Sequence, residues 1–436
     1  MKYTTQTFAI DDIAIFKQQM LNWSNQFNIC CFLDNCNSQD NYHTYEFMLA
    51  VDVFSDIKIT QNNNNWKQEL NAYLTTNALA CFGHISYNFK SVIVNDKHQP
   101  QQEFPLLYFF QPKILIKYKN GALEINTAEV SPNTIFSSIK STTATLLNHN
   151  NKKTKTAVDS IKPTQTKEAY LTAIENLKLE IVKGNCYEIN YCTEFISNNI
   201  HINPIEVYLK LTTLSPTPFA SFYKHHHHYC ITASPERFLK REGKTIIAQP
   251  IKGTIKANPL SLAANEVLKQ TLLHSKKDKA ENVMVVDLVR NDLSKVCIPG
   301  SVYVDELFGI YSFKQVHQMI STVVGTLNNT ATFGDIIEST FPMGSMTGAP
   351  KHKVMQLIDE YEIMNRDIYS GCIGYINNNG DFDFNVVIRS IFYDAHLNKL
   401  SYKVGSGITH YSNAEEEYEE CLLKATAIEQ VLMSNS

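Results

Sequence analysis

A helix-like segment that passes directly into a strand-like segment constrains the fold more than any other feature of this sequence. From Thr166, a candidate N-cap, apolar residues recur at helical spacing until Gly184, a residue type that often ends helices. In CYEINYCTEF, which follows at once, apolar side chains would face one side of a strand, with Glu188 and Asn190 on the other. We therefore predict an α/β or α+β fold in which helices pack on a sheet.

Asparagine-rich polar stretches at 62–65, 148–155 and 377–380 indicate loops. The second stretch is the best candidate boundary, separating an N-terminal region at 1–150 from a second region at 165–432. Before it, ACFGHISYNF and FPLLYFFQPKILIKY are rich in aromatic and β-branched residues, which predicts strands. Because no solenoid or propeller repeat occurs, we expect both regions to be woven into one body.

The composition excludes several functional classes. With 39 Lys and Arg against 43 Asp and Glu, the net charge of −4 provides no general attraction for nucleic acid or an anionic membrane. We find neither a secretion signal nor an apolar run near the roughly 18 residues of a membrane span. We therefore expect a cytoplasmic protein that binds a small molecule and whose ten cysteines, including the core thiols Cys30 and Cys31, stay reduced.

Carboxylates recur on two helix-like segments. In AEEEYEECLLKATAIEQVLM, Glu417, Glu420 and Lys424 share a face opposite an apolar stripe. Ion pairing between Glu420 and Lys424 on a solvated face would explain this pattern. In AENVMVVDLVRNDL, Glu281 precedes an apolar group, and either segment alone is typical of an amphipathic helix. Together, they could supply the oxygen ligands of a hard cation.

Three glycine-bearing segments, PIKGT, FPMGSMTGAPK and VGSGI, would let backbone N–H groups approach an anion. None matches the GxxxxGK[ST] or GxGxxG patterns of nucleotide sites, so a carboxylate is the favoured anion. Arg389 lies in VVIRSIF, an otherwise apolar segment that we expect to be a strand. An arginine there would pair either with an internal acid or with a ligand, and both interpretations stay open.

Lys252 in PIKGT and Glu236 in SPERF lie in turn-like segments beside apolar residues. Such surroundings can lower a lysine's pKa or raise a carboxylic acid's, which would prepare a nucleophile and a general acid. The four histidines at 225–228 look like a metal tract, but consecutive residues of a strand or helix cannot all face one ion. We interpret that run as a surface loop.

Together, these segments resemble the chorismate-utilising enzymes, which include anthranilate synthase, aminodeoxychorismate synthase component I, and the isochorismate and salicylate synthases. The resemblance rests on GNCYEINYCTEF, SPERF, PIKGT, ENVMVVDLVRNDL, GSMTGAPK, SGCIGY, VVIRS, GSGI and EEYEECLLKA, which occur in the family's order. It implies a large two-sheet α/β sandwich flanked by helices, like that of anthranilate synthase component I, with the N- and C-terminal parts interwoven.

The resemblance also implies roles for individual residues. Mg²⁺, bound to the ring carboxylate of chorismate, would be held by Glu281, Glu417 and Glu420. The enolpyruvyl carboxylate would be bound by Arg389 and Tyr375. The remaining pocket residues would be Gly253, Thr254, Thr347, Gly405, Ser406, Gly407 and Lys424. The catalytic residues would be Lys252 as nucleophile, Glu236 as the acid that protonates the departing 4-hydroxyl, and His317.

Two positions indicate which reaction the resemblance implies. Where water-using members carry a lysine base, this chain has Glu188, so ammonia is the expected nucleophile. Lys252 stands where anthranilate synthases usually have alanine, which favours amination to 4-amino-4-deoxychorismate, the precursor of p-aminobenzoate and folate. Many ammonia-using relatives have glutamine at the position of Glu188. In this chain, the Glu188 carboxylate would either pair with Lys252 or perturb the pKa of Lys252.

Ammonia would come from a separate glutamine amidotransferase, because this sequence lacks a nucleophilic Cys in a glycine-rich elbow with a downstream His-Glu pair. Some segments depart from the family pattern: FPMGS replaces FPGGS, VHQM around His317 replaces VHHL, and GSGI replaces GGGI or GAGI. Two alternatives stay open. One is anthranilate synthase component I, which attacks carbon 2 and expels pyruvate, and the other is a catalytically silent carboxylate-binding scaffold.

Overall fold

The computed structural model describes residues 3–38, 42–76, 79–96, 102–144, 161–258 and 260–434. The polar run at 148–155, which we predicted as the domain boundary, lies outside these ranges. Within them, no helix is both long and apolar enough to cross a membrane.

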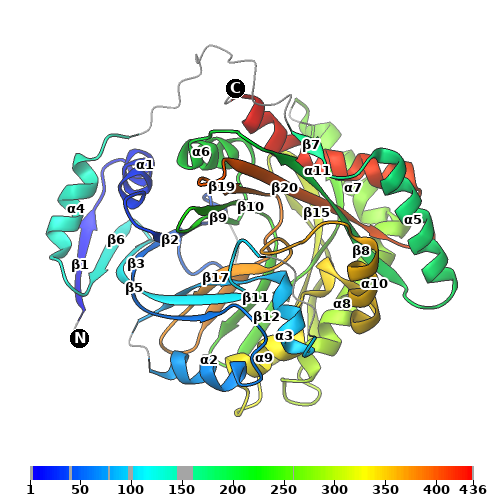
Figure 1. Ribbon diagram of the computed structural model, residues 1–436, viewed down its shortest axis with the longest axis horizontal. Helices are drawn as coiled ribbons and strands as arrows, with labels where there is room; N and C mark the ends of the chain where they lie inside the picture. The colour runs from blue at the N-terminus through cyan, green and yellow to red at the C-terminus, as the bar shows by residue number, and fades with distance from the viewer. Residues whose placement is uncertain are drawn as a thin grey trace.

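Two antiparallel sheets form the centre of the molecule and are joined through one long strand, β5 (Figure 1). The strands of the first sheet are, in ladder order, β1 (Thr4–Ala9), β6 (Ala122–Thr127), β5 (Leu107–Lys119), β3 (Phe47–Ile59), β2 (Ile29–Asp34), β9 (Phe219–His225), β10 (His228–Ser234), β19 (Ser390–Asp394), β20 (Lys399–Ile408) and β8 (Glu188–Ser197). Two short strands, β7 (Lys162–Pro163) and β16 (Gly348–Ala349), pair with β8.

The second sheet continues from β5 in another direction. Its further strands are, in ladder order, β4 (Cys81–Ile85), β17 (Cys372–Ile376), β18 (Phe382–Asn385), β11 (Arg237–Glu242), β12 (Thr245–Gln249) and β15 (Val316–Thr326), with β13 (Ile251–Lys256) and β14 (Tyr303–Ser312) also paired to β15. Pairing of β2 with β9 and of β4 with β17 places strands from both predicted regions in each sheet. The expected interweaving of the two regions is therefore present.

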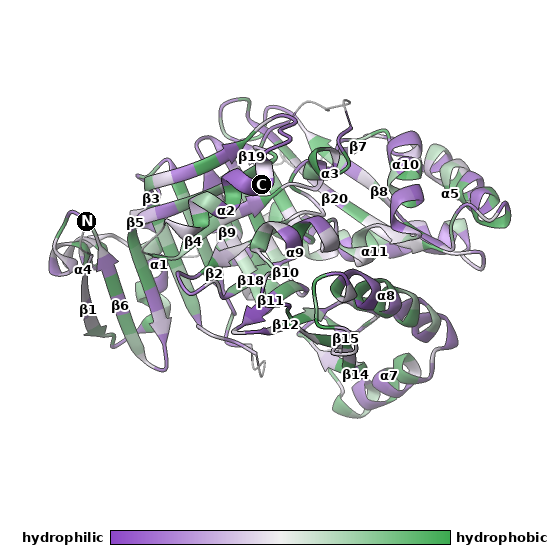
Figure 2. Ribbon diagram, turned by 90° about the horizontal axis from the view of Figure 1, so that it is seen from below, coloured by the Kyte–Doolittle hydropathy of each residue, from purple (hydrophilic) through white to green (hydrophobic). Residues whose placement is uncertain are grey.

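Helices cover the outer surfaces of the sandwich. They are α1 (Ile13–Ser24), α2 (Trp66–Thr75), α3 (Lys90–Ile93), α4 (Pro132–Ser141), α5 (Lys167–Val182), α6 (Pro204–Leu214), α7 (Leu262–His274), α8 (Lys276–Ser294), α9 (Phe333–Thr340), α10 (Lys351–Tyr361) and α11 (Ala414–Ser434), with the 3-10 turns η1 (Tyr87–Phe89) and η3 (Gly344–Met346). In Figure 1, α1 and α4 lie at the left, α5, α8 and α10 at the right, and α2 and α9 at the bottom. Several helices show one polar and one apolar face (Figure 2), as expected for helices that pack on a sheet.

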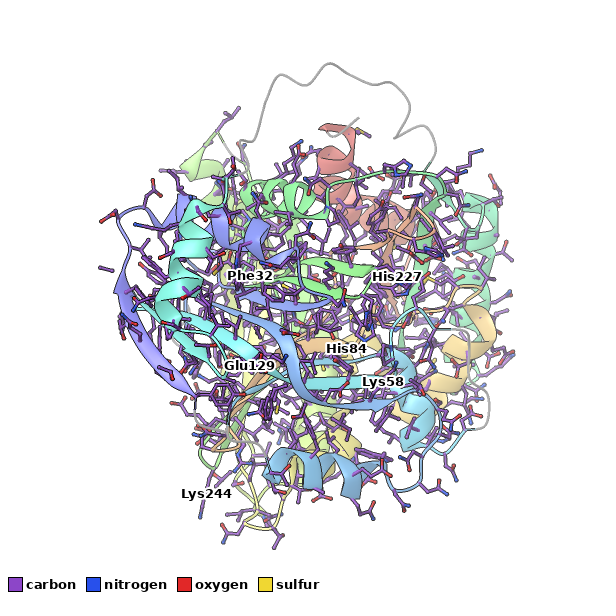
Figure 3. The ribbon with its side chains drawn as sticks, turned by 60° about the vertical axis from the view of Figure 1, so that its left-hand side comes forward. Phe32, Lys58, His84, Glu129, His227 and Lys244 are labelled. Atoms are coloured by element: carbon purple, nitrogen blue, oxygen red, sulfur yellow. The ribbon has the colours of Figure 1, made fainter. Side chains whose placement is uncertain are left out.

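Strand β2 shows how the two hydrophobic cores are separated. Side chains of successive strand residues point to opposite faces. Ile29 and Cys31 therefore enter the core between the sheets, while Cys30 and Phe32 enter the core beneath the outer helices. Cys30 and Cys31 are fully buried free thiols, which confirms the prediction for both. Side chains fill the space between the layers (Figure 3).

The helix predicted from Thr166 to Gly184 and the strand predicted directly after it are both present. The Thr166 hydroxyl accepts a hydrogen bond from the Ala169 N–H and caps α5, and Gly184 follows the helix with φ +81°. The predicted strand is β8, which begins at Glu188. Tyr187, which we expected on the apolar face of this strand, precedes β8 and is 69% exposed. The expectation that Arg389 lies within a strand is wrong, because β18 ends at Asn385 and Arg389 has φ +53° just before β19.

Candidate active site

A cavity of about 120 Å³ is enclosed by segments that lie far apart in the sequence. Its walls come from β8, β13, β15, β20, α8, α11 and η3, and from the connections that precede β11, β17 and β19. Strands β8 and β20 belong to the first sheet and β13 to the second. The cavity therefore exists only when the two sheets are assembled.

Ten of the predicted site residues line this cavity. They are Glu236, Lys252, Gly253, Thr254, Glu281, Arg389, Gly405, Gly407, Glu420 and Lys424. The first and last of them are separated by most of the second half of the chain, so tertiary folding alone brings them together.

Tyr375 is not among them. It lines a different cavity, beside Tyr45 and Asp383, so the structure does not bring it to Arg389 as we expected. Tyr369 lines the cavity instead, and its side chain is 2% exposed. The segment YSGCIGY contains both tyrosines, and the sequence pattern alone does not decide which one faces the cavity.

Thr347 and Ser406 are buried, but their hydroxyl groups have partners outside the cavity lining. The Thr347 hydroxyl donates to the carbonyl oxygen of Met343 at 3.0 Å. The Ser406 Oγ lies 3.2 Å from the Tyr170 hydroxyl, because alternation along β20 turns Ser406 away from its neighbours Gly405 and Gly407. Both residues therefore support the walls of the cavity from behind.

His317 also lies outside the lining. Its Nδ1 is 2.9 Å from the Ser312 Oγ, and its Nε2 is 3.0 Å from the Asn265 Oδ1. The next residue of β15, Gln318, lines the cavity and donates to the Thr254 Oγ1 at 3.4 Å. Strand alternation therefore directs Gln318 into the cavity and His317 away from it, which does not support a direct catalytic contact for His317.

Lys252 forms a buried ion pair with Glu188, since its Nζ donates to the Glu188 Oε1. Burial disfavours the ammonium form, but the carboxylates of Glu188, Glu281 and Glu420 outweigh that effect and raise the pKa of Lys252. The expectation that the surroundings of Lys252 lower its pKa is therefore wrong, because the neighbouring carboxylates raise it. Both roles considered for Glu188 are therefore observed, since it pairs with Lys252 and also raises the pKa of Lys252.

Two glycines give this ion pair its space. A Cβ added to Gly407 would lie 2.6 Å from the Lys252 Nζ and 2.8 Å from the Glu188 Oε1. A Cβ added to Gly348 would lie 2.1 Å from the Glu188 carbonyl oxygen, and Gly348 has φ +141°. The glycines of GSGI and TGAP are thus required by close packing on Glu188 and Lys252.

Glu236 is buried, and its Oε1 accepts a hydrogen bond from the Ser345 hydroxyl at 2.6 Å. Burial raises the pKa of Glu236 to about 7, against the lowering effects of that hydrogen bond and of Lys252 and Arg389. A carboxyl group with such a pKa holds a proton in part of the molecules at neutral pH. A proton held in this way is what a general acid needs at neutral pH.

Cations line another part of the wall. The Lys424 Nζ donates to the Gly405 carbonyl oxygen at 2.8 Å and lies 2.7 Å from the Glu420 Oε1. Arg389 and Lys403 also line the cavity, and burial lowers the pKa of Arg389 to about 10, so its guanidinium stays charged at neutral pH. Lys403, which sequence reasoning missed, is a buried lysine in β20 two residues before Gly405. These groups together suit an anionic ligand.

Acidic side chains from α8 and α11 surround Lys277. Its Nζ lies 3.1 Å from the Glu417 Oε1 and 4.0 Å from the Glu281 Oε1, and Glu417 itself is outside the cavity lining. Asp278 also lines the cavity and was missed. The signal was its spacing, because Asp278 precedes Glu281 by three residues just as Glu417 precedes Glu420, which places each pair on one helix face.

These acids fit a hard cation in chemistry but are not gathered around one point. Among the described residues, the Glu281 Oε1 is buried without a hydrogen-bond partner, and the donor set consists of carboxylate oxygens. The oxygens of Glu281, Glu417 and Glu420 do not all lie within 4.8 Å of one another in this part of the chain. Lys277 offsets part of their charge through Glu417 and Glu281, and Lys424 pairs with Glu420.

Comparison with known proteins identifies the family of the chain that forms this cavity. A family model described as "chorismate binding enzyme" matches residues 29–430. The probable chloroplastic aminodeoxychorismate synthase of Oryza sativa subsp. japonica is 39% identical over 271 residues, which cover 62% of this chain and 30% of the relative. Aminodeoxychorismate synthase component 1 of Bacillus subtilis (strain 168) is 34% identical over 267 residues, which cover 61% of this chain and 56% of the relative. The chain thus matches less than two thirds of either relative.

A solved structure supports the fold. Anthranilate synthase component I from Streptococcus pneumoniae TIGR4 superimposes with a TM-score of 0.74 at 21% identity, covering 90% of this chain and 95% of that chain. The likeness confirms the predicted two-sheet α/β sandwich flanked by helices.

The buried carboxyl group of Glu236 should make protein stability depend on pH. Its pKa rises from 4.5 to about 7 on folding, so the native state binds more protons than the unfolded state between those values and loses stability as pH rises through that window. Glu236→Gln should therefore raise the free energy of unfolding at about pH 8, by about 3 kcal/mol at most, and by much less at about pH 5. Urea unfolding of both proteins at the two pH values measures this difference. Equal stability at the higher pH would contradict the buried, raised-pKa state.

Proposed function

We infer that this chain, which belongs to the chorismate binding enzyme family, aminates chorismate at carbon 4 to give 4-amino-4-deoxychorismate. The observation that carries this proposal is the position of Lys252. It lies in the wall of the same cavity as Glu236 and donates a hydrogen bond to the Glu188 carboxylate. Relatives named aminodeoxychorismate synthase support the same reaction. A chain that keeps a buried Lys252, Glu236 and Glu188 in one cavity is poorly described as a silent scaffold.

The charges of the cavity suit a dicarboxylate such as chorismate. Arg389, assisted by Tyr369, binds the enolpyruvyl carboxylate. Lys424 and the backbone of Gly405 line the same wall and add positive charge and N–H donors. Arg389 also keeps its charge throughout the neutral pH range. Binding of an anion to these groups orients the ring between Glu236 and Lys252.

Glu236 supplies the proton that the departing 4-hydroxyl needs. Its pKa of about 7 keeps part of the enzyme protonated at neutral pH, and the Ser345 hydrogen bond fixes the direction of the carboxyl group. Protonation turns hydroxide, a poor leaving group, into water.

Lys252 forms a bond to carbon 2 of the ring while the double bond shifts and the bond between carbon 4 and oxygen breaks. Its ammonium must first lose a proton, and the Glu188 carboxylate, to which it is hydrogen-bonded, accepts that proton. Ammonia then attacks carbon 4, the double bond shifts back, and the Lys252 amine leaves from carbon 2. In sum, chorismate and ammonia give the 4-amino product and water, so no oxidant or reductant is needed.

Mg²⁺ would be held by Glu281, Glu417 and Glu420, with Asp278 beside them, and would neutralise the ring carboxylate of the substrate. Lys277 would have to leave its position between these acids, because one cation replaces another there. The all-oxygen donor set favours Mg²⁺ over metals that prefer nitrogen or sulfur ligands.

A partner glutamine amidotransferase supplies the ammonia. All ten cysteines lie among the described residues, and none of them forms a disulfide. Nine are buried, and burial raises the pKa of Cys192 and Cys230 to about 12, which is unlike the thiolate of a glutaminase nucleophile.

Product analysis tests the proposed reaction directly. Incubation with chorismate, Mg²⁺ and an ammonium salt should give a 4-amino product that keeps its enolpyruvyl group, because attack occurs at carbon 4 through Lys252. Glutamine in place of ammonium should give no product with the purified chain. Mass spectrometry distinguishes this product from anthranilate and pyruvate, whose appearance would identify the anthranilate synthase alternative. Turnover of neither kind would leave only a carboxylate-binding role.

Lys252→Ala should lose most of the 4-amino product, by a factor of about 10² or more, because the covalent route through carbon 2 is closed. Direct attack of ammonia on carbon 2 would then release some 2-amino product. The matched control is Lys256→Ala, which removes an exposed lysine from the same strand and should retain turnover. Full 4-amination by Lys252→Ala would rule out the nucleophile and leave Lys252 with an electrostatic role.

Glu420→Gln should weaken the dependence of turnover on Mg²⁺, raising the half-saturating Mg²⁺ concentration about tenfold, because it removes one carboxylate of the cation site. Glu419→Gln, on the exposed face of the same helix, is the control and should behave like the unaltered protein. A Mg²⁺ titration of initial rates with both variants compares them. Identical titrations would exclude Glu420 from metal binding.

A further inference from the structure

The histidine run at 225–228 does not form one uniform surface loop. His225 ends β9 and is buried, with its ring 4.8 Å from that of Tyr108. His226 has φ +57° and is exposed, so the chain reverses there and β10 begins at His228. The four imidazoles therefore point in different directions, and the interpretation of the whole run as a surface loop is wrong for His225 and His228.

The turn brings two of the four histidines together at one place. The rings of His227 and His228 have centroids 4.2 Å apart, and His228 is only partly exposed. Figure 3 labels His227 at the turn between β9 and β10. A tight hairpin thus presents two neighbouring imidazoles on the same side.

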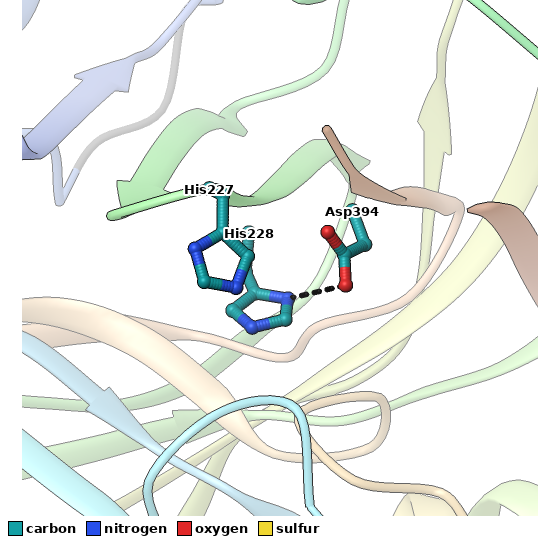
Figure 4. Close-up of side chains that lie close together, drawn as sticks. All are labelled: His227, His228 and Asp394. Atoms are coloured by element: carbon teal, nitrogen blue, oxygen red, sulfur yellow. Dashed lines mark ion pairs between the residues drawn. The ribbon is translucent and has the colours of Figure 1, made fainter. Parts of the chain in front are cut away.

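Asp394 completes the group from a strand far away in the sequence. It is the last residue of β19 and lies directly opposite His228 in the β10–β19 ladder. The Ala395 N–H donates to the His227 carbonyl oxygen at 2.9 Å, which holds the turn against the end of β19. The register of the sheet therefore places this carboxylate beside both imidazoles, as Figure 4 shows.

The polar atoms of this group are close but do not satisfy one another. The His228 Nδ1 lies 3.8 Å from the Asp394 Oδ2, which is too long for a hydrogen bond. Among the described residues, that buried nitrogen has no hydrogen-bond partner. The other carboxylate oxygen, Oδ1, accepts from the His396 and Leu397 N–H groups, so the turn after β19 holds Asp394 in place.

One ion between these atoms would satisfy them. One ligand atom from each of His227, His228 and Asp394 lies within 4.8 Å of the others, and this is the one such group of three in the described part of the chain. Bonds from zinc to imidazole nitrogen and carboxylate oxygen are roughly 2 Å long, so an ion among atoms at this spacing can reach all of them after small side-chain rotations. Two imidazoles and a carboxylate suit Zn²⁺ and related transition ions, whereas Mg²⁺ prefers oxygen ligands.

We propose that His227, His228 and Asp394 form a Zn²⁺ site that clips the β9–β10 turn to the end of β19. The site shares no residue with the cavity proposed to bind chorismate, and its ligand chemistry differs from that of the acids on α8 and α11. Three protein ligands leave a coordination position for water.

Isothermal titration calorimetry of the chelator-treated protein with Zn²⁺, in excess Mg²⁺ to occupy the carboxylates of the cavity, tests the proposal. The unaltered protein should bind one Zn²⁺. Asp394→Asn should weaken binding at least about tenfold, because it removes the charged ligand, while the asparagine oxygen can still accept the two N–H bonds of the turn. His228→Ala should weaken binding at least as much.

His226→Ala is the matched control, because it removes an exposed imidazole of the same run that lies outside the group. It should leave the affinity unchanged. If Asp394→Asn binds Zn²⁺ as tightly as the unaltered protein, or if His226→Ala weakens binding as much as His228→Ala, the run acts as a flexible chelator and the proposal fails. Absence of binding by the unaltered protein also overturns it.

Diffraction at the zinc absorption edge provides a measurement that does not depend on the folding of any variant. A zinc-soaked crystal of the unaltered protein should show an anomalous peak between the side chains of His227, His228 and Asp394. A peak elsewhere, or none in this group, would overturn the site.

Discussion

The buried ion pair between Lys252 and Glu188 is the interaction on which the arrangement of the cavity depends. It connects β13 of the second sheet with β8 of the first, and Gly407 on β20 leaves it room. Taking two charges out of water costs several kcal/mol per ion, which their attraction repays only with good geometry. The protein therefore has to hold both strands and the adjacent glycine in register, and that requirement sets how closely the sheets meet at this end.

Several charged groups are buried around this pair, and burial makes the ionised form of some of them unfavourable for folding. Burial raises the pKa of both Glu236 and Glu281 to about 7, which means that their ionised forms are costly in the folded state. Lys277 compensates for part of the acidic charge by lying between Glu281 and Glu417. A site in which charges are buried and only partly paired is typical of one prepared for a charged ligand, because ligand binding then supplies the missing partners.

The cavity can be assembled because each of the two sheets contains strands from both halves of the chain. β2 pairs with β9, and β4 pairs with β17, so neither half can complete a sheet alone. The ladder that continues through β10 and β19 carries Arg389 at one end and the proposed zinc group at the other. The same register thus positions a residue of the cavity and a separate cluster of side chains, of which only His227 is fully exposed.

The sequence by itself determined several of the helices and strands and most of the charged groups of the cavity. The cap at Thr166, the stop at Gly184 and the apolar stripe of α11 are local patterns, set by hydrogen bonding and side-chain periodicity within a few residues. The family motifs indicated Glu236, Lys252, Arg389 and the acids of two helices. Only the tertiary structure decided which of Tyr369 and Tyr375 faces the cavity, because Tyr369 lies in the turn before β17 and Tyr375 within β17, and the packing of both against other segments sets where each ring points. It also decided that Lys252 is charged, since a lysine's pKa depends on the carboxylates that long-range contacts bring to it, and that two histidines meet Asp394 across a strand ladder.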